Sequence, residues 1–353
     1  MNVLDLARAD IRALQPYASA RMEAASGGIW LNANESALAP HGDRGLGCHR
    51  YPEPQPPALV NALAELYAVR CDQLLLTRGS DDGIDLLVRA FCRAGTDAIL
   101  IQEPTFGMYA VCARIQGADI ITVPLAADFT VDVDAVLAAL APAVKLVFVC
   151  APNNPSGQRV EPSTLLQLAA ALAGRALLVV DEAYVEFADG GSAAAWLDRY
   201  PHLVVLRTLS KAWALAGARL GSVLAGAEII DLLRRILPPY PLPRPSVDAA
   251  LRALSASGCV AARERIATIR VQREQVASAL RDIVLVREVL PSQANFLAVR
   301  FHDAQAAWQR LLDAGVVVRD VRRYPGLGDA LRITIGTPTE NARMLGALRE
   351  IAA

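Results

Sequence analysis

The amino-acid sequence predicts an α/β protein with two domains, a larger one with a mostly parallel sheet flanked by helices and a smaller α+β one. Three observations lead to this prediction. The chain has 353 residues, more than one hydrophobic core usually supports. From about Leu74 to Leu224, short apolar runs alternate with helical patterns, which is typical of a parallel sheet between helices. After the proline-rich segment Leu237–Pro245, this alternation ends.

The expected strands of the larger domain are short and apolar. They lie at Leu74–Leu76, Ala98–Gln102, Asp119–Val123, Leu146–Cys150, Leu177–Val180, Leu203–Arg207 and Leu220–Ala225. Helical patterns between them include Asp81–Arg93, Phe106–Gln116, Val133–Leu140 and Ser163–Leu172. Sheets of this kind bind ligands beyond the carboxyl ends of their strands, so polar residues at those ends are candidates for a functional site.

The C-terminal third predicts a compact unit that begins with a long amphipathic helix, roughly Cys259–Arg281. Strand, strand, helix, strand, strand and helix then follow at Val284–Leu290, Asn295–Phe301, Ala304–Ala314, Val316–Val318, Leu331–Ile335 and Glu340–Ile351. We expect the larger domain to span residues 28–260, and the smaller domain to comprise residues 1–27 and 261–353.

The composition argues against several classes of function. The 35 basic and 36 acidic side chains nearly cancel, which gives no reason to expect nucleic acid or an anionic membrane as a partner. The longest uncharged stretches, Leu146–Gln158 and Pro162–Gly174, have thirteen residues each, too few to cross a membrane as a helix. Asp5 and Asp10, with no apolar run beside them, do not fit a signal peptide.

The cysteines and histidines argue against disulfide bonds and against a metal site. The six cysteines form no CxxC pair, so free thiols in a reducing cytoplasm are expected. The four histidines have no metal-binding spacing, and no catalytic metal is expected.

Lysine is scarce in this chain, which draws attention to Lys211. Of the 35 basic residues, 33 are arginine and only Lys145 and Lys211 are lysine. Arginine replaces lysine well on a solvated surface, but not where an amine must lose its proton and react. Lys211 follows the expected strand Leu203–Arg207. A solvated loop lysine is the ordinary alternative, but an amine with a lowered pKa could form a covalent bond to a carbonyl.

Three more segments at strand ends carry polar residues with two interpretations each. Asp181 ends an apolar strand and is either an N-cap or the partner of a protonated ring nitrogen. Asn153 and Asn154 lie in a turn-forming segment, and an amide there could also face a ligand oxygen. Gly79-Ser80-Asp81 precedes a helix, where free backbone N–H groups attract phosphate, although Ser and Asp are also common N-caps.

Together these segments resemble the signatures of fold-type I pyridoxal-phosphate aminotransferases. Ser210-Lys211 followed by Ala216-Gly217-Ala218-Arg219 is similar to SK(x)nAGxR, Asn153–Gly157 to NNP[TS]G, and Asp181–Tyr184 to DEAY. Leu31–Glu35 and Arg50–Gln55 are most similar to the histidinol-phosphate aminotransferases. The motifs occur in the right order from about Ile29 to Gly336, and nearly the whole chain is covered.

The resemblance implies pyridoxal 5′-phosphate as the cofactor, bound as a Schiff base on Lys211, whose amine then shuttles a proton. Asp181 would bind the pyridine nitrogen, while Asn154 and Tyr184 would bind the phenolic oxygen. Phe106 would stack on the ring; the family often has Tyr there, and the π-face is kept. The phosphate would be held by Gly79, Ser80, Asp81, Ser210 and Arg219, with Thr208 nearby. Tyr51 would reach the phosphate from the other subunit, which implies a homodimer with shared active sites.

The substrate is expected to be a small anionic molecule. Arg332 lies in an otherwise apolar strand, where it makes a structural ion pair or, as the resemblance implies, grips an anionic group of the substrate. Arg319, Tyr17 and Asn34 are the further substrate contacts that the resemblance implies. Two arginines and a tyrosine suit a phosphate, and the resemblance to the histidinol-phosphate aminotransferases implies the reaction of L-histidinol phosphate plus 2-oxoglutarate to imidazole-acetol phosphate plus glutamate.

Three alternatives remain open. A related pyridoxal-phosphate enzyme could act on aromatic amino acids, or be a decarboxylase or lyase acting on a phosphorylated amino acid. An aminotransferase-like regulatory module would need an attached DNA-binding domain, and the sequence shows no basic helix-turn-helix pattern. A nucleotide-binding oxidoreductase fits the alternation of strands and helices, but no GxGxxG follows a strand.

Overall fold

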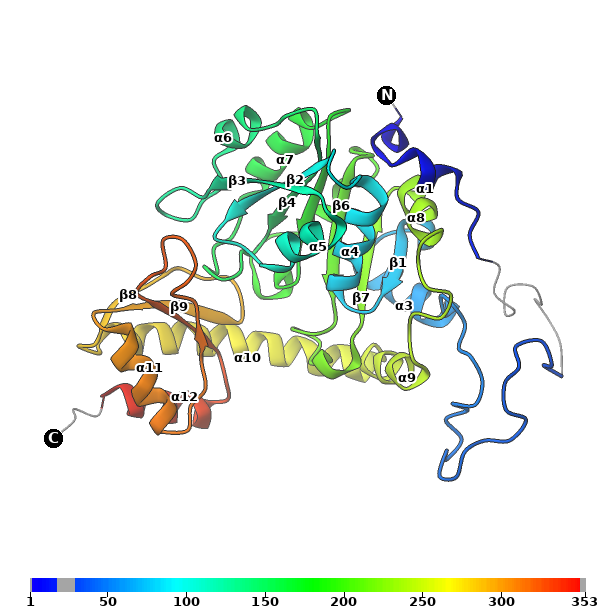
Figure 1. The fold of residues 1–353 in the computed structure, drawn as a ribbon. Coiled ribbons are helices and arrows are strands. Elements are labelled where there is room, and N and C mark those ends of the chain that lie inside the picture. Colours follow the sequence, from blue (N-terminus) through cyan, green and yellow to red (C-terminus); the bar gives the residue numbers. More distant parts are fainter. Residues whose placement is uncertain (1, 18–28, 350–353) are drawn as a thin grey trace.

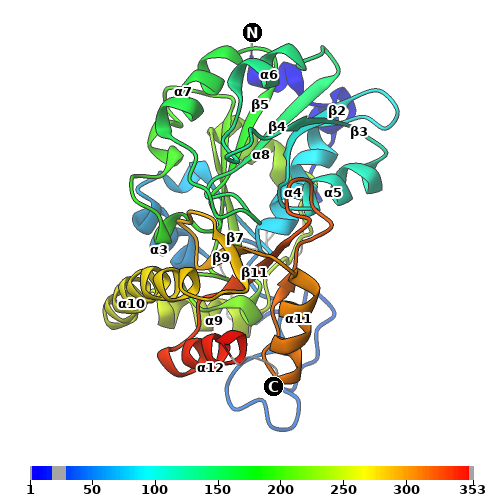
Figure 2. The same ribbon diagram turned by 90° about the vertical axis from the view of Figure 1, so that its left-hand side faces the viewer.

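The computed structural model describes residues 2–17 and 29–349, and contains two sheets, each packed against helices (Figures 1 and 2). The larger sheet has seven strands in the order β1-β7-β6-β5-β4-β2-β3. Their bounds are β1 Leu74–Thr77, β2 Ala98–Glu103, β3 Asp119–Pro124, β4 Val144–Cys150, β5 Leu177–Asp181, β6 Leu203–Thr208 and β7 Gly221–Ala225. All seven expected strands are confirmed.

The direction of the strands also agrees with the prediction of a mostly parallel sheet. β3, β2, β4, β5 and β6 pair in parallel, and β7 alone runs antiparallel to both of its neighbours, β6 and β1. The carboxyl ends of β4, β5 and β6 therefore lie side by side at one edge of the sheet.

The larger sheet is buried on both faces, because successive side chains of a strand point to opposite sides. In β4, Leu146 and Phe148 belong to one hydrophobic cluster, and Val147 and Val149 belong to the other. The first cluster includes residues of α4 Ser80–Phe91, α5 Met108–Gln116 and α8 Ala227–Arg234. The second includes residues of α3 Pro57–Tyr67, α6 Val133–Ala138, α7 Pro162–Ala171 and α9 Arg244–Ala253. Burial on both faces explains the continuous apolar runs of these strands.

The smaller sheet is antiparallel throughout. Its order is β10-β11-β9-β8, with bounds β8 Val286–Val289, β9 Phe296–Phe301, β10 Arg319–Asp320 and β11 Ala330–Thr334. It shares a hydrophobic cluster with α10 Ala256–Arg281, α11 Ala304–Asp313 and α12 Pro338–Arg349. Figure 1 shows α10 running from α9, below the larger sheet, to β8. The remaining helices are short: α1 Ala9–Ala13 and the 3-10 turns Val3–Leu6, Cys71–Gln73, Val185–Phe187, Ala193–Trp196 and Ala216–Ala218.

One expected strand is wrong. The residues Val316–Val318 are not in a strand, and β10 begins only at Arg319. Three consecutive valines have high β-propensity, but a strand also needs a paired neighbour. Only Arg319 and Asp320 pair with β11, opposite Arg332 and Leu331. The last expected helix, Glu340–Ile351, is α12, and its residues beyond 349 lie outside the described part of the chain.

The domain boundaries, 28–260 and 1–27 with 261–353, stay a prediction. One packing contact favours a different place for the N-terminal segment. Leu6 and Ala7 belong to the cluster that α4, α5 and α8 form against the larger sheet. The N–H of Arg8 donates to the carbonyl of Ala90, the penultimate residue of α4, at 3.0 Å. We propose that residues 2–17 belong with the larger domain.

A small apolar cluster joins the two sheets, next to the loop that follows β3. Phe129, in the loop between β3 and α6, packs with Leu290, Ala298, Val321, Leu327 and Ala330 of the smaller sheet and its loops. The guanidinium of Arg300 lies 5.7 Å from the centre of the Phe129 ring. This contact fixes the smaller sheet relative to the strand ends of the larger one.

Among the described residues, none of the helices has the length and apolar character needed to cross a membrane. Within residues 2–17 and 29–349, His, Cys, Asp and Glu side chains also form no group of three or more that could hold a metal ion.

Candidate active site

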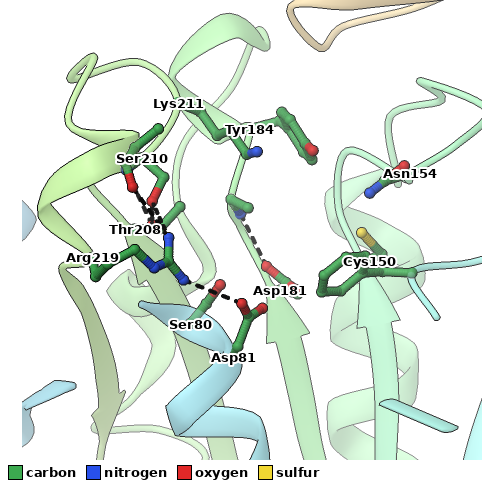
Figure 3. A pocket seen from close by; sticks show the side chains of 13 residues that line it. Ser80, Asp81, Cys150, Asn154, Asp181, Tyr184, Thr208, Ser210, Lys211 and Arg219 are labelled. Carbon is green, nitrogen blue, oxygen red and sulfur yellow. Dashed lines mark hydrogen bonds and ion pairs between the residues drawn. The ribbon is translucent and has the colours of Figure 1, made fainter. Parts of the chain in front are cut away.

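A pocket lies at the carboxyl ends of β4, β5 and β6, where it also meets the N-terminus of α4 (Figure 3). The empty space within it, counted up to the open solvent, is about 580 Å³. The side chains that line it come from segments far apart in the sequence: Ser80, Asp81, Phe106, Cys150, Asn154, Asp181, Ala183, Tyr184, Thr208, Ser210, Lys211, Ala216 and Arg219. Ten of the residues expected at the site are thus brought together in one place.

Lys211 reaches into this pocket from the loop that follows β6. Its Nζ lies 5.7 Å from the centre of the Tyr184 ring, and Figure 3 shows the two side chains facing each other. The Lys211 side chain is exposed to the open pocket, but the protein atoms around its Nζ partly desolvate the amine. That desolvation lowers the pKa of Lys211, and the positive charge of Arg332 lowers it further. The neutral, reactive form of this amine is therefore more accessible than that of an ordinary lysine.

Asp181 ends β5 at the base of the pocket and is only 2% exposed. One carboxylate oxygen accepts a hydrogen bond from the Tyr109 hydroxyl at 2.8 Å, and the other accepts from the N–H of Ala183 at 3.1 Å. No ion pair of Asp181 occurs among the described residues. Burial raises the pKa of Asp181 to about 6, although both hydrogen bonds act in the opposite direction. A buried carboxylate without a counter-ion suits a cationic N–H group of a ligand.

The other end of the pocket is built for an anion. α4 begins at Ser80, and its N-cap residue Gly79 makes no side-chain cap, so backbone N–H groups remain for a ligand. A guanidinium nitrogen of Arg219 lies 3.5 Å from the hydroxyl of Ser210 and the other lies 3.3 Å from Asp81. Thr208 accepts from the N–H of Ser210 at 3.1 Å and orients that residue.

Two features favour a glycine at position 79. Its φ of +79° is a conformation that other residues rarely adopt, and a Cβ there would lie 2.7 Å from a nitrogen of Arg219. Gly221, which the sequence did not single out, has a similar task. A Cβ at Gly221 would lie 2.4 Å from the backbone of Gly79. A glycine at the start of β7 thus lets the α4 N-terminus approach the sheet.

Asn154 and Arg332 connect the two sheets at the mouth of the pocket. An Nη of Arg332, on β11, donates to the side-chain oxygen of Asn154. This leaves the amide nitrogen of Asn154 to donate to a ligand. The guanidinium of Arg332 also lies 5.1 Å from the centre of the Phe296 ring, and its Nε is buried without a partner. The structural ion pair that was the alternative for Arg332 is not formed with the described residues.

Arg319 lies beside Arg332 although it does not line the pocket. The two residues are directly opposite each other in the β10–β11 pair, so their side chains leave the same face of the sheet. Arg319 is exposed. Two arginines on one face, next to the pocket, provide positive charge for an anionic group.

Three of the expected residues lie elsewhere in this single chain. Tyr51 stacks on Tyr240 at 4.4 Å between ring centres, and Asn34 lines a separate pocket with it. Tyr17 lines a third pocket, between the N-terminal segment and α8. All three side chains are exposed. This placement fits residues that act across an interface between subunits, as the expected role of Tyr51 requires.

The sequence did not single out Tyr109 or Cys150, both of which lie next to Asp181. Cys150 ends β4 and lines the pocket, while Tyr109 lies behind it on α5. The available sequence signal for Tyr109 is its spacing of three residues from Phe106 within the expected helical pattern, although in the structure Phe106 precedes α5. Glu182 and Arg207 were also missed, and they form a buried ion pair at 3.4 Å between β5 and β6.

Comparison with known proteins gives consistent matches. A family model described as class I and II aminotransferases matches residues 30–348. The chain is 54% identical over 352 residues to a histidinol-phosphate aminotransferase of Xanthomonas euvesicatoria pv. vesicatoria, covering 99% of this chain and 97% of that protein. It is 53% identical over 356 residues to one of Xylella fastidiosa, covering 100% and 98%.

Two solved structures have a similar fold. The histidinol-phosphate aminotransferase of Sinorhizobium meliloti, in complex with pyridoxal-5′-phosphate, matches with a TM-score of 0.78 and 28% identity, over 90% of this chain and 89% of that one. The enzyme of the same name from Clostridium acetobutylicum matches with a TM-score of 0.79 and 22% identity, over 87% and 91%.

Proposed function

We infer the function of this protein from its family, because the chain belongs to the class I and II aminotransferases. It is a transaminase with pyridoxal 5′-phosphate as its cofactor. It transfers the amino group of L-histidinol phosphate to 2-oxoglutarate and gives imidazole-acetol phosphate and glutamate, a step of histidine biosynthesis. The observation that carries this inference is the meeting of Lys211, Asp181 and Arg219 around one pocket, together with Arg332 at its mouth.

The residues of the pocket fit pyridoxal phosphate. An amine with a lowered pKa, Lys211, suits the cofactor aldehyde, and the uncompensated carboxylate of Asp181 suits a protonated pyridine nitrogen. The free N–H groups at the start of α4, with Ser210 and Arg219, suit a phosphate. Phe106 lines the same pocket and offers a ring for stacking.

When bound, pyridoxal phosphate supplies an aldehyde carbon for the amine and a ring that withdraws electrons from it. Lys211 would hold it covalently through Nζ. Once displaced by the substrate amine, the Nζ of Lys211 takes the proton from the amine-bearing carbon of the substrate. The lowered pKa of this lysine makes Nζ a base at a milder pH than an ordinary lysine. Lys211 thus serves first as an attachment point and then as the proton carrier.

Three other residues would keep the ring in place and in the right protonation state. Asp181 would accept from the N–H of the pyridine ring and keep its proton there. Asn154 and Tyr184 would donate to the phenolic oxygen. Burial raises the pKa of Tyr184, so its hydroxyl stays protonated and remains a donor.

Arg319 and Arg332 would together bind the anionic group of the substrate. Arg332 has a buried Nε without a partner, and a bidentate guanidinium matches both a carboxylate and a phosphate. L-Histidinol phosphate brings a phosphate, while glutamate brings a carboxylate. The same arginines can therefore serve both halves of the reaction.

The enzyme acts as a homodimer, in which Tyr51 of one subunit reaches the phosphate at the pocket of the other. This homodimer is supported by three exposed side chains that do not line the pocket of their own chain, those of Tyr17, Asn34 and Tyr51. The enzyme works in the cytoplasm. Its six cysteines are free, as expected for a reducing compartment.

The test is an absorbance spectrum of the purified protein before and after addition of L-histidinol phosphate, without a keto acid. Conversion of the pyridoxal band to that of pyridoxamine phosphate supports the proposal. A yellow protein that converts only with another amino donor would show that the substrate is wrong. Release of carbon dioxide from a phosphorylated amino acid, with no pyridoxamine formed, would identify a decarboxylase. A protein that stays colourless with added pyridoxal phosphate would overturn the whole proposal.

A further inference from the structure

Tyr109 contacts two of the residues that are expected to touch the cofactor ring, although its own side chain does not line the pocket. Its hydroxyl donates to Asp181 at 2.8 Å. Its ring meets Phe106 edge to face, with 5.7 Å between the ring centres and an angle of 84°. On the other side it stacks on Phe148 of β4 at 4.7 Å. Tyr109 is fully buried, and these contacts hold it in one position.

We propose that Tyr109 is a positioning residue for Asp181, whose hydroxyl keeps the carboxylate ionised and thereby keeps the ring nitrogen of pyridoxal phosphate protonated. This inference rests on the proposed function. It assigns a task to a residue outside the pocket lining, which acts on the cofactor only through Asp181.

The geometry gives the hydroxyl this effect. Asp181 is nearly inaccessible to water, so the protein itself must solvate its negative charge. It has only two donors among the described residues, the Tyr109 hydroxyl and the N–H of Ala183. The backbone donor cannot be removed by substitution, while the hydroxyl is present only because residue 109 is a tyrosine. Burial and the nearby Asp181 raise the pKa of Tyr109, so the hydroxyl donates and never competes for the negative charge.

Other titratable groups also face the carboxylate. Besides Tyr109 on α5 they are Cys150 at the end of β4, Asp81 on α4, Tyr184 after β5 and Lys211 after β6. Lys211 favours the ionised carboxylate, and Asp81 opposes it. Burial raises the pKa of Cys150, which therefore stays a neutral thiol. Among these groups Tyr109 is the one that hydrogen-bonds Asp181 directly.

The decisive variant is Tyr109→Phe, which removes the hydroxyl and keeps the ring contacts. A hydrogen bond to a charged group shifts a pKa by about one to two pH units. The first measurement follows the melting temperature of the cofactor-free, full-length protein against pH. Ionisation of Asp181 causes a fall in melting temperature as the pH rises. In the variant this fall should occur at a pH higher by about one to two units. The second measurement is nitrogen NMR of the holoenzyme loaded with ring-labelled pyridoxal phosphate. The chemical shift of the pyridine nitrogen should move from that of a protonated ring toward that of an unprotonated ring.

Tyr67→Phe is the matched control. The Tyr67 hydroxyl is buried too, but it lies near Arg207 and has no contact with Asp181. Loss of the Tyr67 hydroxyl should change neither the pH at which the melting temperature falls nor the chemical shift of the pyridine nitrogen. In an Asp181→Asn background, Tyr109→Phe should likewise have no effect on the nitrogen signal, because the charge it stabilises is gone.

The outcomes separate this inference from the proposed function. If wild type has a protonated ring nitrogen and Asp181→Asn loses it, while Tyr109→Phe matches wild type in both measurements, the role of Tyr109 is refuted and the function stands. If the wild-type nitrogen is unprotonated, or no pyridoxal phosphate binds, the role proposed for Asp181 fails and this inference fails with it. A shift in Tyr109→Phe that Tyr67→Phe reproduces equally would also overturn it.

Discussion

Replacing Asp181 with Asn should make the cofactor-free protein more stable at neutral pH. Burial raises the pKa of this carboxyl group from 3.8 to about 6, so the folded state binds its proton more tightly than the unfolded state does. The protein therefore loses stability as the pH rises from about 4 to about 6. One pH unit corresponds to about 1.4 kcal/mol, which gives a penalty of about 3 kcal/mol above pH 6. An amide of the same shape avoids this penalty; its oxygen can accept from the N–H of Ala183, while its NH2 group donates to the Tyr109 hydroxyl oxygen, which can also act as an acceptor.

The assay compares the melting temperatures of cofactor-free wild type and Asp181→Asn between pH 4 and pH 8. The difference should be small at pH 4, grow up to about pH 6 and stay constant above it, at several degrees in favour of the variant. The variant should bind pyridoxal phosphate more weakly, which is the usual conflict between stability and function. If the variant is less stable than wild type at pH 8, or if the difference does not depend on pH, the reasoning is refuted.

Asp97→Asn is a control that should change stability in the opposite direction to Asp181→Asn. Asp97 is also only 2% exposed, but it accepts from the Nε of Arg93 at 2.8 Å. Burial acts to raise the pKa of Asp97, but the hydrogen bonds and charge of Arg93 outweigh it and lower the pKa. The ionised form therefore stabilises the fold above its unfolded pKa of 3.8. This variant should be less stable than wild type at pH 8 and lose that disadvantage in acid.

Three further predictions concern the chemistry, the substrate and the contact between the sheets. Lys211→Ala should abolish turnover, because the pocket has no other lysine; steady-state assays that find full activity would contradict the mechanism. Arg319→Ala should raise the KM for L-histidinol phosphate more than that for glutamate, and equal changes would show that Arg319 does not read the phosphate. Phe129→Ala should cost about 3 kcal/mol, because it empties a buried apolar site between the sheets, and an unchanged melting temperature would count against that contact.

The positions of the larger sheet's strands along the chain, and the polar residues that follow them, could be predicted from the sequence. Strands such as β4 and β5 are buried on both faces, so their apolar runs are continuous and easy to recognise. The run of β5 ends in Asp181 and that of β6 in Thr208, while Asn153 lies three residues after the end of β4. The motifs around Lys211 and Asn154 then indicate the cofactor, since a chemical group must be supplied by a particular residue type.

Contacts between distant segments were decided only by the tertiary structure. The Val316–Val318 run has the composition of a strand but lacks a neighbour to pair with, and pairing is not a local property. Tyr109 lies 72 residues from Asp181 in the sequence and becomes its partner only because α5, packed against β2, β3 and α4, places the Tyr109 hydroxyl beside the end of β5. Gly221 needs its small size only because the start of α4 approaches β7.

The sequence by itself therefore predicted most of the elements, the candidate site residues and the family, because these depend on residue type and short-range order. Tertiary structure decided which donors solvate Asp181, what lowers the pKa of Lys211 and which arginine side chains share a face. Desolvation and charge–charge interactions depend on distances between atoms in space, and separation along the chain does not specify those distances.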